Sequence, residues 1–151
     1  MPIVATSLFA LFALAGAWLD VASRRLPNWL CLATTLAGLA AAFAQGGAEA
    51  LPSPALHAVL ALLAGMALFR IGWIGGGDAK FYAACAAWFP LASGFYLVGA
   101  VSLAGLVVIT LWFGWRQLTH ARTRKDGEAF SMVPYGLAVA IGAVALKVWA
   151  P

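Results

Sequence analysis

The chain has 151 residues, of which 64% are hydrophobic and only 9% are charged, and its mean hydropathy is +0.95. An average soluble domain has about 25% charged residues, so no soluble fold could bury this much apolar surface, and the composition predicts a membrane protein. The net charge of +4 does not indicate nucleic-acid binding, because there is no soluble basic domain to carry it.

The first predicted membrane span covers residues 3–19 and ends at Asp20. The polar residues 23–25, followed by Pro27 and Asn28, then break the helix. A cleaved signal peptide is the alternative for this segment. We expect a retained helix, because no Lys or Arg precedes the apolar run as a signal peptide requires.

Two further spans follow, separated by a short polar loop. Residues 29–44 form the second span, which the Gln-Gly-Gly sequence at 45–47 ends. Residues 49–54 form a loop containing prolines. Residues 56–69 form most of a third span, which is entered through Pro54 and closes at Arg70.

The segment 81–115 contains no charged residue over 35 positions. As one helix it would be about 52 Å long, against a hydrocarbon core of about 30 Å. Two spans with a turn at Pro90 and Gly94 fit better, with a short fourth helix and a longer fifth one. The sixth span is predicted over residues 132–149.

The distribution of basic residues tests this count of spans. Six spans place eight of the nine Lys and Arg residues on one side, namely Arg24, Arg25, Arg70, Lys80, Arg116, Arg122, Arg124 and Lys125. The positive-inside rule makes that side cytoplasmic. We therefore predict an all-α protein with one membrane-embedded domain over residues 1–151, six transmembrane helices and both termini outside the cytoplasm.

Two acidic residues, Asp20 and Asp78, are predicted at the same depth near the cytoplasmic face. Acids beside the membrane interior are costly and indicate function. Two simpler interpretations stay open: Asp78 follows three glycines and could be a helix N-cap, and Asp20 could pair with Arg24 at helical spacing. Asp126 and Glu128 lie in the longest cytoplasmic loop, where they are either solvated or in contact with a basic peptide.

The glycines before Asp78 leave space beside its carboxylate. Residues 75–78 read Gly-Gly-Gly-Asp, which contains a Gly-x-Gly-Asp motif in which Gly75 and Gly77 flank the path to the acid. An extended peptide substrate needs such space. The motif opens a membrane helix while a second Asp lies at the same depth, and this favours an aspartyl protease.

Three segments then resemble the prepilin peptidase (type IV leader peptidase) family of intramembrane proteases. They are Asp20 with its basic residues and Leu-Pro-Asn at 26–28, Gly-Gly-Gly-Asp-Ala-Lys at 75–80, and Val-Pro-Tyr-Gly-Leu-Ala at 133–138. The resemblance is closest to the small TadV/CpaA-type peptidases that serve Flp pili. It implies Asp20 and Asp78 as catalytic residues, with a site shaped by Gly75, Gly77, Lys80, Arg24, Pro27, Asn28, Pro134 and Tyr135.

The resemblance also implies a substrate and a location. The substrate is a prepilin whose basic leader is cleaved after a glycine at the cytoplasmic face of the bacterial inner membrane, with the pilus assembly machinery as a further partner besides the lipid bilayer. The two aspartates act on water without a metal or other cofactor, and His57 and His120 lack partner ligands at metal spacing. Because the chain lacks the CxxC-bearing insert of the larger enzymes, we do not expect methyltransferase activity.

Two other classes of function compete with this interpretation. A small transporter or proton-conducting subunit could use Asp20 and Asp78 as a relay, but such proteins place acids near mid-membrane. A non-catalytic assembly subunit with the same fold should lack one Asp, and both are present. Lys80 has two possible roles: it anchors the chain at the headgroups, or it adjusts the ionisation of Asp78 or positions a substrate carbonyl.

Overall fold

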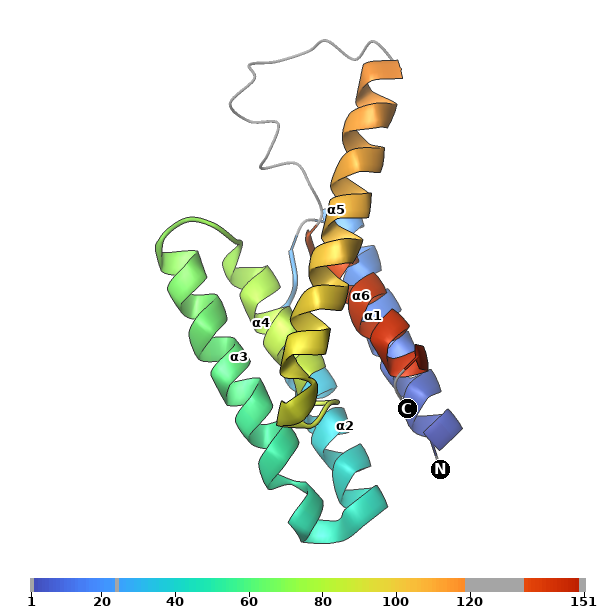
Figure 1. Ribbon diagram of the computed structural model, residues 1–151, viewed down its shortest axis with the longest axis vertical. Coiled ribbons are helices and arrows are strands. Elements are labelled where there is room, and N and C mark those ends of the chain that lie inside the picture. Colours follow the sequence, from blue (N-terminus) through green and yellow to red (C-terminus); the bar gives the residue numbers. More distant parts are fainter. Residues whose placement is uncertain (1, 24, 119–134, 150–151) are drawn as a thin grey trace.

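The computed structural model describes residues 2–23, 25–118 and 135–149 as a helical bundle (Figure 1). Its α-helices are α1 (Pro2–Ser23), α2 (Asn28–Gly46), α3 (Pro52–Arg70), α4 (Gly76–Ala86), α5 (Gly94–Leu118) and α6 (Tyr135–Trp149). Two 3-10 turns, η1 (Gly47–Ala50) and η2 (Leu91–Ser93), join α2 to α3 and precede α5. The described residues contain no strand, so the all-α prediction and the count of six helices are confirmed.

The six helices differ in length. Among the described residues, four helices are long and apolar enough to cross a membrane, over Ile3–Ser23, Asn28–Ala50, Pro52–Arg70 and Leu91–Trp115. Helix α4 has 11 residues and is about 16 Å long, and α6 has 15 residues and is about 22 Å long, both less than the hydrocarbon core. The predicted sixth span began at residue 132, and its first three residues lie outside the described part of the chain.

Two predicted boundaries were wrong. Helix α1 continues through Asp20 to Ser23, whose hydroxyl donates a hydrogen bond to the Leu19 carbonyl (2.8 Å), so Asp20 lies inside the helix instead of ending it. Helix α3 begins at Pro52, within the predicted loop 49–54, because proline is well tolerated in the first turn of a helix.

The helices alternate in direction along the bundle (Figure 1). The connections α1–α2 and α3–α4 lie at one end, which we call the carboxylate end because it contains Asp20 and Asp78. The turns α2–α3 and α4–α5 and both labelled termini lie toward the opposite end. Termini on the same side are what an even number of crossings requires. Which end faces the cytoplasm stays a prediction from the basic residues.

Helix α4 is the centre of the bundle, in contact with α2, α3 and α6. Small residues permit this close packing. A Cβ added at Gly38 of α2 would lie 2.9 Å from the Ala87 carbonyl oxygen, and one added at Gly65 of α3 would lie 3.0 Å from the Ala79 Cβ. The chain at and just beyond the end of α4 is also buried, with Ala87, Trp88 and Phe89 almost fully covered.

Side chains from α3 and α6 bind the backbone carbonyls of the turn that follows α4. Lys147 donates a hydrogen bond from Nζ to the Trp88 carbonyl (3.0 Å) and lies 5.1 Å from the centroid of the Phe89 ring. His57 Nδ1 lies 3.1 Å from the Phe89 carbonyl oxygen. The Trp88 indole donates to the Thr34 carbonyl (2.9 Å). These bonds hold α2, α3 and α6 to one buried turn, which lies at the end of the bundle opposite the carboxylate end.

Replacing Lys147 by methionine is expected to destabilise the bundle without changing the chemistry at the carboxylate end. The change removes one hydrogen bond to the Trp88 carbonyl and so costs about 0.5–1.5 kcal/mol. Thermal unfolding in detergent measures this cost, and Lys147→Arg, which keeps a donor, should lose less. An equal melting temperature for Lys147→Met and the unmodified chain would contradict this role.

Candidate functional site

Asp20 is buried in the last turns of α1, where it is only 7% exposed. Its carboxylate packs against the backbone of Gly136 in α6: a Cβ added at Gly136 would lie 2.8 Å from Oδ2 and 2.9 Å from Cγ of Asp20. Any residue larger than glycine at position 136 would therefore have to displace the carboxylate. The α1–α6 contact fixes where the Asp20 side chain can lie.

Asp78 is the third residue of α4 and is half-buried. Its carboxylate accepts a hydrogen bond from the backbone of Gly75. The N-cap interpretation of Asp78 was wrong, because Gly75 occupies the N-cap position and Asp78 reaches back to it from the first turn. A Cβ added at Gly75 would lie 2.6 Å from Oδ2 of Asp78, so glycine is needed there for space.

The backbone angles support this explanation of the glycines. The described glycines with positive φ are Gly47 and Gly72, both outside the Gly-Gly-Gly-Asp segment. Gly75 has an extended conformation that any residue can adopt (φ −71°, ψ 144°). The motif therefore provides room beside the carboxylate and needs no unusual backbone conformation.

The two carboxylates are close enough to interact electrostatically. Gly16 of α1 and Phe81 of α4 are in contact one helical turn away from the acids. Gly16 is four residues before Asp20, and Phe81 is three residues after Asp78. A Cβ added at Gly16 would overlap the ring of Phe81, which is fully buried. The Phe81 ring therefore lies directly against the backbone of α1, one helical turn from each acid.

The Leu-Pro-Asn segment and the first turn of α4 also contact each other. A Cβ added at Gly77 would lie 3.5 Å from the Leu26 Cβ. Lys80 donates a hydrogen bond from Nζ to Oδ1 of Asn28 (3.1 Å). Pro27 precedes α2, and its carbonyl accepts bonds from the backbone N–H groups at the start of that helix. Residues 26–28 and the first turn of α4, about 50 residues apart in the sequence, thus contact each other beside Asp78.

Replacing Lys80 by methionine is expected to slow turnover by only two- to tenfold. The change removes the bond to Asn28, and one such bond contributes about 0.5–1.5 kcal/mol to holding the two segments together. With a prepilin, the substrate that the sequence resemblance implies, initial cleavage rates measure the effect. Arg70→Met is the control, because Arg70 is an exposed base at the end of α3. A loss above about a hundredfold would instead indicate proton-transfer chemistry at Lys80.

The remaining predicted site residues are Tyr135, Arg24 and Pro134. Tyr135 begins α6 and packs against the buried pair Val108 and Ala138. Arg24 and Pro134 lie outside the described residues, as do Asp126 and Glu128, so the predicted Asp20–Arg24 pairing stays untested. Sequence reasoning missed Gly16 and Gly136, although Gly136 belongs to the 133–138 segment.

The arrangement can perform acid–base chemistry with two carboxylates. Neighbouring carboxylates in a buried site resist ionising together, so one proton is retained between them. In such a pair the ionised carboxylate can act as a general base, and the protonated carboxyl beside it can act as a general acid. Within the described residues, no three His, Cys, Asp or Glu side chains are grouped closely enough to hold a metal ion, and Cys31 and Cys85 are buried free thiols.

Comparison with known proteins identifies one family. The sequence model described as the Type IV leader peptidase family matches residues 7–110. This range includes both aspartates, the Leu-Pro-Asn segment and the Gly-Gly-Gly-Asp motif, whereas α6 lies beyond it. Neither the curated proteins nor the solved structures contain a significant match to the chain.

Proposed function

Because this chain belongs to the type IV leader peptidase family, we propose that it is an aspartyl endopeptidase in which Asp20 and Asp78 cleave the leader from a prepilin. Family membership supports leader peptidase activity and a multi-pass inner-membrane protein. The observation that carries the catalytic assignment is that two acids from different helices, the buried Asp20 and the half-buried Asp78, lie at the same end of the bundle. Neither a helix cap nor a solvated acid requires a second acid at the same end of the bundle.

The reaction needs one water molecule and one shared proton. The ionised carboxylate takes a proton from water while the water oxygen attacks the carbonyl carbon of the scissile bond. The protonated carboxyl donates its proton to the carbonyl oxygen. As the tetrahedral intermediate collapses, the C–N bond breaks and the amine leaves with the proton taken from water. The pair titrates as a unit, so neither role is assigned to one Asp.

The proposed substrate is an Flp-type prepilin with a short basic leader that ends in glycine. The sequence contains no CxxC pair of the kind found in the larger prepilin peptidases, and this supports the choice. The described bases Arg25, Arg70 and Lys80 lie on segments at the carboxylate end, which the positive-inside rule makes cytoplasmic. Cleavage would then occur at the cytoplasmic face of the inner membrane.

A proton or ion carrier is the competing function, and the arrangement of acids does not favour it. Asp20 lies in the last turn of α1 and Asp78 in the first turn of α4. Both carboxylates are thus near one end of the bundle, and Glu49, the remaining acid among the described residues, is exposed in η1. A relay across the membrane would need acids at intermediate depth.

Co-expression with an Flp-type prepilin tests the proposed function. We expect the unmodified chain to shorten the prepilin in membranes, read as a gel shift, and a matched membrane without the chain to leave it intact. Proton flux into vesicles containing the purified chain provides the second readout. Flux without cleavage would replace the peptidase by the carrier.

A further inference from the structure

A small pocket with one charged wall lies at the end of the bundle opposite the carboxylates, and we call it the Lys147 pocket. Its walls come from the end of α2, from η1, from the start of α3, from the turn after α4 and from α6. Its volume is about 280 Å³. One molecule of liquid water occupies about 30 Å³, so the pocket has room for a group several times larger than water.

Lys147 is a base on the side of the protein where bases are rare. Six spans place the other eight Lys and Arg residues at the opposite, predicted cytoplasmic side, so the positive-inside rule gives Lys147 no role in topology. A lysine near the end of a membrane helix usually extends toward water. Lys147 is instead half-buried, with Nζ 3.0 Å from the Trp88 carbonyl oxygen and 5.1 Å from the centroid of the Phe89 ring. The structure therefore holds a positive charge at the wall of the pocket.

The polar side chains around the pocket have hydrogens left to donate. The Lys147 ammonium has three N–H groups, of which the bond to the backbone carbonyl uses one. The Ser53 hydroxyl accepts a bond from the Leu91 N–H (2.9 Å), which leaves its own hydrogen available. Gln45 donates from Nε2 to the Ala41 carbonyl (3.0 Å), which leaves a second amide hydrogen and the oxygen Oε1. Donors thus come from three different helices, α6, α3 and α2.

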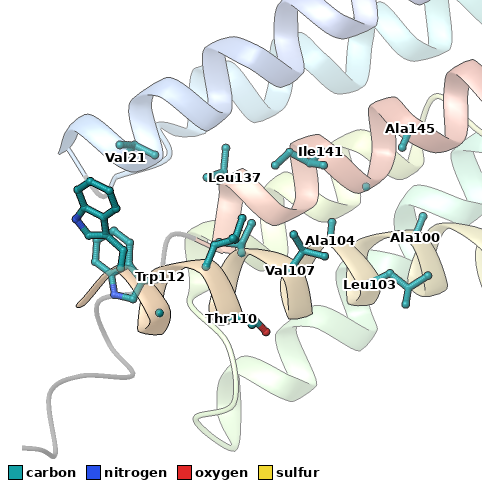
Figure 2. A pocket seen from close by; sticks show the side chains of 15 residues that line it. Val21, Ala100, Leu103, Ala104, Val107, Thr110, Trp112, Leu137, Ile141 and Ala145 are labelled. Atoms are coloured by element: carbon teal, nitrogen blue, oxygen red, sulfur yellow. The ribbon is translucent and has the colours of Figure 1, made fainter. Parts of the chain in front are cut away.

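The pocket has no negative charge of its own. None of its lining residues is acidic, and Glu49, which precedes Ala50 in η1, is exposed and is not among them. The larger pocket between α5 and α6 has apolar walls without a charged residue, so it contains nothing that selects a charged ligand (Figure 2). In the Lys147 pocket, a half-buried cation with free donors around it favours an anion.

We propose that the Lys147 pocket binds a phosphate group, either in the headgroup of an anionic phospholipid or as free inorganic phosphate. Phosphate oxygens point in several directions, which suits donors on three walls better than the two oxygens of a planar carboxylate. Lysine binds phosphate as a point charge, and basic pockets between membrane helices are typical sites for anionic headgroups. The site does not depend on the peptidase activity. A bound phosphate would join α2, α3 and α6 and so stabilise the bundle.

Thermal unfolding tests this site in the purified chain, washed free of lipid in an uncharged detergent. The probes are phosphatidylglycerol, with zwitterionic phosphatidylcholine as its control, and inorganic phosphate, with chloride at equal ionic strength as its control. At about 100 times the dissociation constant, a bound ligand should raise the melting temperature by roughly 5–10 °C. We expect this rise with at least one of the two phosphate probes and with neither control.

Three variants of equal net charge locate the effect. Lys147→Met removes the cation. Gln45→Glu places a negative charge on the pocket wall at an exposed position, with little change of shape and with the contacts of Lys147 retained. Arg70→Met is the control, because it also lowers the net charge by one but lies at the carboxylate end. The rise in melting temperature should persist in Arg70→Met and be lost in the other two variants.

The two probes also distinguish the sources of the phosphate group. A rise with phosphatidylglycerol alone assigns the site to a lipid headgroup, a rise with inorganic phosphate alone assigns it to the free anion, and a rise with both shows a site open to either. No rise with either probe, or equal rises in Gln45→Glu and Arg70→Met, would overturn the proposal. If Lys147→Met does not fold, the comparison of Gln45→Glu with Arg70→Met decides.

Discussion

Asp20→Asn and Asp78→Asn should each lower the rate of prepilin cleavage by about 10²–10⁴-fold, the usual contribution of general acid–base catalysis. Asparagine has nearly the same shape as aspartate but can neither accept a proton from water nor donate one as an acid. Because the carboxylates of the buried Asp20 and the half-buried Asp78 repel each other, loss of one charge should leave the melting temperature unchanged or raise it. Loss of activity with retained stability is the expected pattern.

Two companion variants make the comparison specific. The double variant should be about as inactive as either single variant, since residues that act as a unit are not additive. Glu49→Gln serves as the control, because it removes an exposed carboxylate in η1 and should keep full activity. Wild-type cleavage rates in both single Asn variants would remove the two-aspartate mechanism.

Gly136→Ala is expected to give the second largest loss, although it adds a single methyl group. The new Cβ would lie 2.8 Å from Oδ2 and 2.9 Å from Cγ of Asp20, too close to be accommodated without moving the carboxylate. A misplacement of about 1 Å can cost roughly 10²-fold in rate. We expect a loss of about that size in kcat, measured on protein whose folding is checked by thermal unfolding.

Gly99→Ala is the matched control for this effect. Gly99 also lies within a helix, α5, and a Cβ added there would meet nothing within 4 Å. Alanine is better than glycine in a helix interior by about 1 kcal/mol, so Gly99→Ala should not weaken α5. If Gly136→Ala were as active as Gly99→Ala, then the contact between α6 and Asp20 would have no role in positioning the acid.

Much of the fold could be predicted from hydropathy and charge. The six helices follow from the length of apolar runs and from the turn at Pro90, which divides the segment 81–115 into α4 and α5. The end of α1 could not be predicted, because Val21 and Ala22 are compatible with a helix and nothing in the sequence requires it to stop at Asp20. The contacts of Lys147 and His57 with the carbonyls of the turn after α4 could not be predicted either, because these side chains come from distant helices.

The candidate site was predictable in its acids and less so in its supporting residues. Asp20 and Asp78 stand out because acids are rare in this chain and the topology brings both to one depth. Gly16 and Gly136 do not stand out, because glycine is common in membrane helices. Their importance lies in contacts with Phe81 and Asp20, which are 65 and 116 positions away in the sequence and leave no local pattern.

The most direct test of the central claim is the mass of the products formed from an Flp-type prepilin by the purified chain in lipid vesicles. The account predicts two fragments that together gain one water molecule, with the cut after the glycine that ends the leader. Neither fragment should form with Asp20→Asn or with Asp78→Asn. An intact prepilin beside folded, unmodified chain, or the same fragments from both Asn variants, would contradict the account.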